Sequence, residues 1–387
     1  MRSYKIQSEI NNMITFFYRI GFWHRGPDAS PVQLIVKLFY CILYSQFTAS
    51  LVGGAIINPS IGETVFLVET SIITIVFLAK LCFLMWKQNE IVELLNGICI
   101  FRIRYDEDFN RVDVKLRKFI KFVKVVVLVT LVACVVEGIL IPIIKSGKYL
   151  FYKIAFPWDW KTNDVAYVAA VTFVFIEILM SLAAFFFSII IWYVLLNCSL
   201  RYEVLGNELR KTGSECDIEI ESKISGQERK NIFYTDLKES IDNYTQIRKL
   251  IDQLESFCFY LFLLQFCTSG LCICGSIYSL AFDVGGNTVE RLCHIFNLVY
   301  NTSEIFMITF FGNEILVSSD RLSYCLFESN FVNQTESVKK LIIIFGEYLK
   351  QPHQLTICNL YPLTLETFTR IMKGAYSTFN ILTNLMQ

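Results

Sequence analysis

The chain has 387 residues, of which 54% are hydrophobic and 15% aromatic, and its formal net charge at pH 7 is zero. Its mean hydropathy of +0.47 is too high for a water-soluble globule. The balanced charge gives no field that would attract nucleic acid, so we expect no nucleic-acid partner. The composition therefore predicts an integral membrane protein that crosses the bilayer several times.

Long apolar runs predict an all-α fold with seven transmembrane helices. The N-terminus lacks the pattern of a cleaved signal peptide, so we expect the first long run to act as the membrane anchor. The expected spans are 33–57, 64–86, 121–144, 165–198, 256–282, 288–317 and 362–386. The first six are clear from hydropathy, whereas the seventh is marginal because it carries Glu366, Arg370 and Lys373.

The distribution of Lys and Arg predicts the orientation of the chain. These residues gather in the N-terminal segment and in the second, fourth and sixth connections between spans. The first and fifth connections contain no Lys or Arg, and the third contains lysines but no Arg. By the positive-inside rule, the N-terminus is cytosolic and, after seven spans, the C-terminus is extracellular. This orientation is opposite to that of a G-protein-coupled receptor.

Some helices are expected to continue into the cytosol. Residues 165–200 contain no Gly or Pro, and as one helix they would extend about 54 Å, beyond a hydrocarbon core of about 30 Å. The apolar run 341–345 is too short to span and lies between charged residues, so it predicts a buried helix that ends before Pro352. We expect these segments to form a cytosolic helical anchor bundle. The alternative is a set of amphipathic connections on the inner leaflet.

The sequence contains no enzyme motif. HExxH, P-loop and GxSxG patterns are absent, and there are only three histidines. The predicted outer loops contain none of the thirteen cysteines, and the pair Cys272 and Cys274 lacks partners at metal-ligand spacing. We therefore expect no catalytic residue, no metal and no cofactor.

Ionisable residues within the spans are the better clue to function. Four of them lie in the predicted outer half of the membrane, where a charged group is costly. A concave, mostly aromatic cavity with a few polar groups is the usual form of a small-molecule site. The candidate ligand-binding residues are Phe66, Glu69, Thr70, Cys134, Glu137, Gly138, Phe173, Glu177, Met180, His294, Asn297 and Tyr300. The alternative is that these groups only join helices through hydrogen bonds.

Polar residues recur at three- and four-residue steps in the seventh span and therefore share one helix face. They are Thr369, Lys373, Tyr376, Ser377, Asn380 and Asn384. Such a face is costly in lipid but not in a water-filled channel, which would need several subunits around one axis. The alternative is a helix buried inside a bundle, with Lys373 extending to the interface. The residues alone leave both interpretations open.

The C-terminal region resembles that of insect odorant receptors. The stretches 310–322 and 341–382 carry the resemblance, and "FPWDW" at 156–160 is similar to a recurrent element of the family. The matching positions are Gly312, Asn313, Glu314, Pro352, Thr356, Leu360, Leu363, Phe368, Ile371, Lys373, Tyr376, Ser377, Phe379 and Leu382. Two positions depart from the pattern: Cys358 replaces a usual Gly, and Phe331 replaces a frequent Trp.

The resemblance implies a tuning subunit that forms a heterotetramer with the odorant receptor co-receptor, as an odorant-gated, non-selective cation channel. It implies a small volatile ligand, with aromatic compounds among the candidates, contact with membrane lipid, and a place in the plasma membrane of sensory neuron dendrites. The alternative is a seven-helix chemoreceptor, of gustatory type or coupled to a transducer, that does not need the co-receptor.

On this interpretation the chain divides into five parts. They are a cytosolic N-terminal segment (1–32), transmembrane helices one to four (33–200), cytosolic extensions with helices five and six (201–330), a cytosolic anchor helix (331–352) and a pore-lining seventh helix (360–387).

Overall fold

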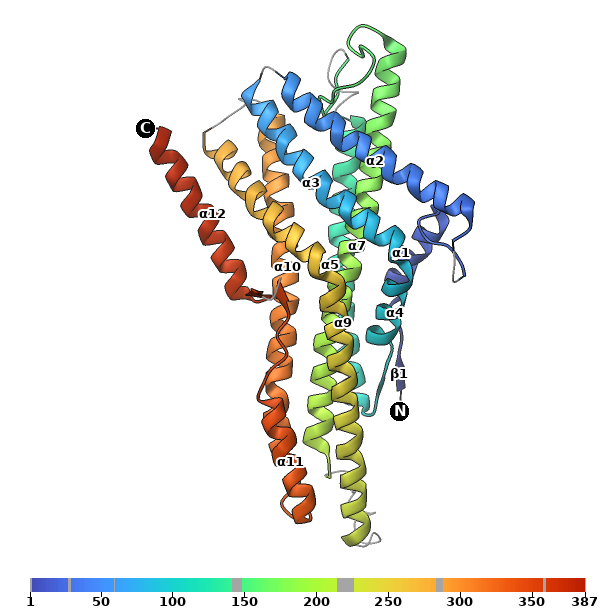
Figure 1. Ribbon diagram of the computed structural model, residues 1–387, viewed down its shortest axis with the longest axis vertical. Coiled ribbons are helices and arrows are strands. Elements are labelled where there is room, and N and C mark those ends of the chain that lie inside the picture. Colours follow the sequence, from blue (N-terminus) through green and yellow to red (C-terminus); the bar gives the residue numbers. More distant parts are fainter. Residues whose placement is uncertain are drawn as a thin grey trace.

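The computed structural model describes residues 2–26, 29–58, 60–140, 148–213, 226–282, 288–357 and 360–386. The helices are α1 (Ser8–Arg19), α2 (Pro31–Ile57), α3 (Ile61–Trp86), α4 (Gln88–Cys99), α5 (Asp106–Val135), α7 (Asp164–Lys211), α9 (Gly226–Ala281), α10 (Thr288–Phe327), α11 (Glu336–Leu349) and α12 (Leu365–Met386), as Figure 1 shows. A π-helical turn, η1 (Val136–Leu140), continues α5. The predicted all-α fold is confirmed.

Two short antiparallel strand pairs fasten connections to the helices. Strand β1 (Arg2–Tyr4) pairs with β2 (Phe101–Ile103), and β3 (Thr356–Ile357) pairs with β4 (Tyr361–Pro362). The first pair joins the N-terminus to the segment between α4 and α5. The second pair lies directly before α12.

Five helices in the described part of the chain are long and apolar enough to cross a membrane: α2, α3, α5, α7 and α9. Helices α10 and α12 complete the expected seven. Hydropathy placed the span in α10 among the clear ones, but α10 is not one of these five helices, and it carries several buried polar residues. They are His294, Asn301, Glu304 and Thr309.

Helices α7, α9 and α10 contain 48, 56 and 40 residues, whereas about 20 residues suffice to cross a bilayer. Their ends extend together toward α11, at the end of the molecule opposite the C-terminus (Figure 1). The predicted extension of these helices is therefore confirmed. Helix α11 buries Ile342 and Phe345, but Ile343 and Ile344 are exposed. The expected buried helix is thus buried on one face only.

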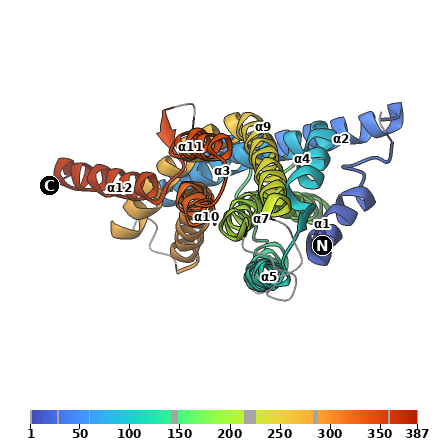
Figure 2. The ribbon, with the colours of Figure 1, turned by 90° about the horizontal axis from the view of Figure 1, so that it is seen from below.

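Helix α7 lies at the centre of the bundle, as the view from below shows (Figure 2). Every residue from 187 to 200 is buried, as expected for a helix that is apolar on all sides. Its polar side chains bond within the helix: Asn197 donates to the Tyr193 carbonyl oxygen at 2.7 Å, and Ser199 donates to the Leu196 carbonyl oxygen at 2.9 Å. These two donors are therefore satisfied within α7, whereas Ser188 accepts a hydrogen bond from Lys80 of α3.

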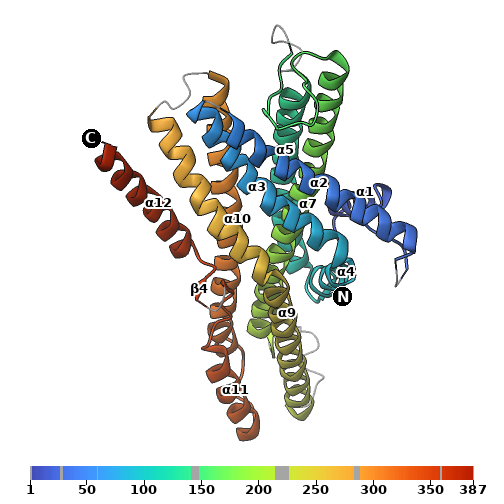
Figure 3. The ribbon, with the colours of Figure 1, turned by 45° about the horizontal axis from the view of Figure 1, so that its top comes forward.

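Helix α12 diverges from the bundle (Figure 3). Among the described elements, it packs mainly against α9 and α10. Its C-terminal end lies at the end of the molecule opposite α11, whereas the N-terminus lies toward α11 (Figure 1). This arrangement fits a cytosolic N-terminus and an extracellular C-terminus. Cys358 and residues 141–144 of the third predicted span lie outside the described residues.

Gly312 fixes the point at which α12 begins. A Cβ added to Gly312 would lie 2.7 Å from the Leu363 Cβ, closer than real Cβ atoms approach one another. Leu363 comes just before α12, and its N–H donates to the Leu355 carbonyl oxygen at 2.8 Å. The missing side chain at position 312 therefore lets α10 pack directly against the backbone that leads into α12.

We predict that Gly312→Ala lowers the thermal stability of the detergent-solubilised protein, because overpacking of this kind costs about 1–3 kcal/mol. Fluorescence-detected size-exclusion chromatography after heating measures the effect. The matched control is Gly270→Ala in α9, where an added Cβ meets nothing within 4 Å and Ala favours the helix. Equal melting temperatures for the two variants would contradict the proposed contact.

Candidate functional site

Glu69 of α3 joins three helices in the outer half of the bundle. Its Oε2 atom accepts hydrogen bonds from His294 Nδ1 at 3.0 Å, Ser276 Oγ at 3.2 Å and Asn297 Nδ2 at 3.5 Å. Ser276 belongs to α9, and His294 and Asn297 belong to α10. Glu69 is 3% exposed and His294 is 1% exposed. We call these four residues the Glu69 cluster.

Three aromatic rings lie beside the Glu69 cluster. Phe66, one turn before Glu69, stacks on Tyr152 with ring centroids 5.8 Å apart. The Phe66 ring also meets the Phe151 ring at 5.9 Å and the His294 ring at 6.0 Å, both nearly perpendicular. We call Phe66, Phe151 and Tyr152 the aromatic cluster; it closes the space next to Glu69.

Tyr152 connects the aromatic cluster to Glu137. Its hydroxyl donates to Glu137 Oε2 at 3.0 Å. Tyr152 is not among the predicted residues, because these all lie in the spans and Tyr152 lies in the connection after the third span. The run of aromatic residues in that short outer connection was the available signal.

The expected cavity is nearly closed in this structure. The space beside the aromatic cluster has a volume of about 20 Å³, and Phe66, Phe151 and Cys293 are among its lining residues. That volume holds about one water molecule, whereas small-molecule pockets usually measure about 300 Å³ or more. A ligand therefore requires movement of the aromatic rings.

The other predicted residues belong to neighbouring parts of the bundle. The Phe173 ring packs against Phe47 at 6.0 Å and Phe156 at 6.1 Å. Glu177 is fully buried, and neither of its carboxylate oxygens has a partner among the described residues. Met180 is buried, Cys134 is half-buried, Gly138 packs against Phe175, and the Thr70 hydroxyl donates to the Phe66 carbonyl oxygen.

An ion pair that sequence analysis missed lies deeper in the bundle. Lys80 Nζ of α3 is 3.1 Å from Glu304 Oε1 of α10, and it also donates to Ser188 Oγ of α7 at 2.8 Å. The side chains of Lys80 and Glu304 are 4% and 1% exposed. Lys80 is a lone charge in an apolar run, and Glu304 lies between a short polar stretch, 301–303, and an apolar one, so a search of the spans for charged residues would have found both.

Tyr300 belongs to this ion-pair network and not to the Glu69 cluster. Its hydroxyl donates to Glu304 Oε1 at 3.3 Å, and its ring packs against Phe77 with centroids 5.5 Å apart. The predicted ligand-binding residues thus do not form one site: some belong to the Glu69 cluster, Glu137 bonds to Tyr152, Tyr300 joins the Lys80–Glu304 network, and the others lie elsewhere in the bundle.

The predicted polar face of α12 is exposed in the single chain. Its described members are Thr369, Lys373, Tyr376, Ser377 and Asn380, and all five are exposed; the side chain of Asn384 lies outside the described residues. On the opposite face, Ala375 is buried and Phe368 meets Phe306 of α10 at 5.4 Å. Because α12 is one continuous helix, the three- and four-residue spacing of these side chains keeps them on the same side of it.

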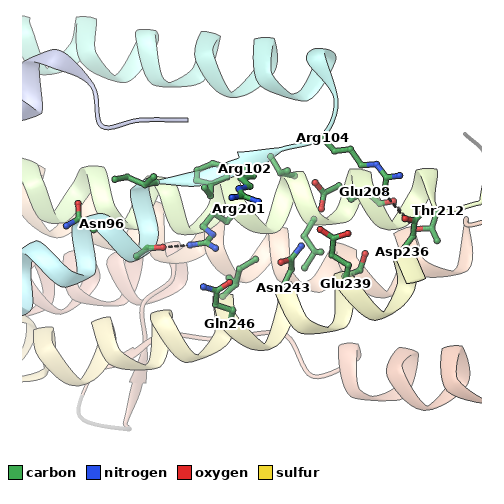
Figure 4. A pocket seen from close by; sticks show the side chains of 17 residues that line it. Asn96, Arg102, Arg104, Arg201, Glu208, Thr212, Asp236, Glu239, Asn243 and Gln246 are labelled. Carbon is green, nitrogen blue, oxygen red and sulfur yellow. Dashed lines mark hydrogen bonds and ion pairs between the residues drawn. The ribbon is translucent and has the colours of Figure 1, made fainter. Parts of the chain in front are cut away.

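A larger, polar cavity lies where α7 and α9 extend toward the α11 end of the molecule (Figure 1). It measures about 410 Å³ and lies between the α4–β2 segment, α7 and α9 (Figure 4). Arg104 forms an ion pair with Asp236 at 2.9 Å. Burial, with the nearby carboxylate of Glu239, raises the pKa of Glu208 to about 7. Because acidic and basic groups face the same space, this cavity suits water more than a ligand of one charge.

His353 holds the linker that precedes α12. His353 Nε2 lies 3.0 Å from Asp252 Oδ1, and its Nδ1 lies 2.8 Å from the Tyr202 hydroxyl. Glu255 accepts the Thr356 N–H at 2.9 Å. Asp252, Glu255 and His353 bring possible metal ligands within 4.8 Å of one another, but their contacts already fasten the linker to α7 and α9.

Comparison with known proteins identifies relatives along most of the chain. A family model described as 7tm Odorant receptor matches residues 60–376. The chain is 27% identical over 231 residues to Odorant receptor 23a of Drosophila melanogaster, covering 59% of this chain and 57% of that receptor. It is 26% identical over 160 residues to Odorant receptor 10 of Aedes albopictus, covering 41% of this chain and 42% of that receptor. The chain thus matches about half the length of these relatives.

The fold is similar to that of the insect olfactory receptor OR5 from Machilis hrabei. Against its structure in complex with eugenol, the TM-score is 0.76 at 13% identity, covering 98% of this chain and 100% of the other. Against a further structure of that receptor, the TM-score is 0.79 at 14% identity, covering 97% and 99%. At this identity the likeness shows the fold alone, and it confirms the predicted seven-helix membrane architecture.

We predict that Lys80→Met and Glu304→Gln each lower the melting temperature and the surface expression of the protein. Removing one member of a buried ion pair costs roughly 3–5 kcal/mol because the other charge stays buried without a partner. The double variant Lys80→Met/Glu304→Gln should recover much of the loss. A double-mutant cycle of melting temperatures measures the interaction, and strictly additive effects would contradict it.

Proposed function

The chain belongs to the odorant receptor family of insects, and from this premise we propose that it is the odorant-specific subunit of a non-selective cation channel. It binds a small volatile in the outer half of the helix bundle and opens a central pore together with the co-receptor, in a heterotetramer. It acts in the plasma membrane of sensory neuron dendrites. The family is one of receptors and not of enzymes.

The exposed polar face of α12 carries this proposal. Tyr376 is 62% exposed in the single chain, and Thr369, Lys373, Ser377 and Asn380 are exposed on the same face. The Thr369 hydroxyl donates within the helix to the Leu365 carbonyl oxygen, but lipid would leave the other four polar groups without hydrogen bonds at a high cost, whereas a water-filled pore would hydrate them. Since one helix cannot enclose a pore, the face requires further subunits around a common axis.

The packing of α10 supports control of that pore by a ligand. Helix α10 carries His294 and Asn297 of the Glu69 cluster and, further along, Phe306, which packs against Phe368 of α12. A displacement of α10 at the Glu69 cluster therefore acts on the helix that lines the pore. The ligand has to bind the displaced state more tightly than the packed one for this to open the channel.

The surroundings of the proposed binding site favour an aromatic ligand. Phe66, Phe151 and Tyr152 offer ring faces and edges of the kind that aromatic compounds contact. Eugenol, which is bound in one of the OR5 structures, is itself aromatic.

Whole-cell current tests the proposed function. Cells that express this chain together with an insect co-receptor should give a cation current with particular volatiles, and cells that express either chain alone should give none with the same compounds. Surface labelling of the chain in each case controls for expression. A second-messenger response without current in the paired cells would overturn the channel proposal.

We further predict that Lys373→Gln changes the conductance or rectification of the paired channel only modestly, because co-receptor subunits supply most of the pore lining. Single-channel recording with a fixed odorant measures the change. The matched control is Lys340→Gln on the exposed surface of α11, which should leave conductance unchanged. Complete loss of current in Lys373→Gln, with normal surface expression, would contradict this role.

A further inference from the structure

We propose that Glu69 and His294 select ligands that carry a hydrogen-bond donor on an aromatic or similarly compact body, such as phenols and indoles, over the matching ethers and N-alkyl compounds. This inference rests on the proposed function, because it names the ligand class of the same site.

The first observation is a pair of buried atoms without partners. Oε1 of Glu69 and Nε2 of His294 have no hydrogen-bond partner among the described residues, although the two residues are only 3% and 1% exposed. All three donors described above bond to the other carboxylate oxygen, Oε2. Folded proteins contain few buried polar atoms in this state, and a missing ligand is one physical reason for them.

The chemistry of the two free atoms defines the complementary group. A carboxylate oxygen only accepts hydrogen bonds, so Oε1 needs an O–H or N–H. In a neutral imidazole whose Nδ1–H points at Glu69, Nε2 is also an acceptor. An ether or ester supplies only acceptors and would leave Oε1 unpaired, whichever protonation state His294 adopts.

The neighbouring polar groups are already used. The Tyr152 hydroxyl donates to Glu137 at 3.0 Å, and the Thr70 hydroxyl donates to the Phe66 carbonyl oxygen at 2.8 Å. Glu69 and His294 therefore keep free bonding positions next to Phe66, whose ring is one wall of the small cavity. Neither Glu69 nor His294 lines that cavity, so a ring reaches the free oxygen of Glu69 only by displacing the aromatic cluster.

Gly275 of α9 provides an independent probe of the carboxylate position. A Cβ added at Gly275 would lie 2.6 Å from Glu69 Oε1, so the carboxylate would have to move. Gly275→Ala therefore disturbs the free oxygen without changing any polar group of the cluster.

Matched ligand pairs test the proposal. Para-cresol against its methyl ether, and indole against N-methylindole, differ in one donor and little in size. In the paired channel, we expect the half-maximal concentration of each donor to be lower than that of its methylated partner by about tenfold or more, because a buried acceptor left unpaired weakens binding by this order.

Variants separate recognition from general damage. In Glu69→Gln and in Gly275→Ala, the ratio between the half-maximal concentrations of the methylated compound and its donor partner should fall toward one. The donor compounds should lose more activity than the methylated compounds. The matched control is Glu90→Gln on the cytosolic helix α4, which exchanges the same groups in an exposed ion pair and should keep the preference.

The shift in melting temperature of the purified receptor with each compound gives a readout that does not depend on current. Greater stabilisation by the donors, lost in Glu69→Gln, would support the ligand class even if the channel proposal failed. Equal half-maximal concentrations and equal thermal shifts for both members of each pair would overturn the ligand class, while odorant-evoked current would leave the channel proposal intact.

Discussion

The requirement that a charge in the membrane interior must find a partner determines how this bundle is put together. Lys80 and Glu304 are nearly fully buried and lie 3.1 Å apart, with Ser188 as the second contact of the lysine. Three helices thus meet at one point inside the low-dielectric core. With Glu304 turned inward, Asn301 and Asn297 of α10 lie three and seven residues earlier and so face the same way. The ion pair therefore also orients the face of α10 that reaches Glu69.

Helix α10 is consequently the element that all functional regions share. It contacts the Glu69 cluster through His294, the ion pair through Glu304, and α12 through Phe306 and Gly312. A single continuous helix of 40 residues moves largely as one body over this distance. The ion pair holds α10 near its middle. A displacement of the outer end of α10 would therefore be accompanied by a displacement where α10 contacts the start of α12.

Features that depend on periodicity were predictable from the sequence, and features that depend on pairing were not. Helical spacing was enough to place Thr369 and Lys373 on one face of α12 and to extend α7 past the membrane, because both follow from 3.6 residues per turn. The Lys80–Glu304 contact joins residues 224 positions apart, and no local pattern encodes that distance. The closed state of the proposed site also escaped prediction, since ring positions such as that of Tyr152 depend on side-chain packing and not on hydropathy.

The closed aromatic cluster and the free atoms of Glu69 and His294 have opposite effects on the stability of the state without ligand. Ring packing of Phe66 against Tyr152 stabilises the state without ligand, while the unpaired buried atoms destabilise it. A ligand fits only the state in which the rings are displaced, and one that merely replaced the lost ring contacts would gain little net free energy there and would shift the equilibrium weakly. A ligand that also donates a hydrogen bond to Glu69 Oε1 gains an interaction that the packed state lacks, so its affinity for the open state is higher. Selectivity for the ligand and the ability to shift the conformation would then come from the same hydrogen bonds.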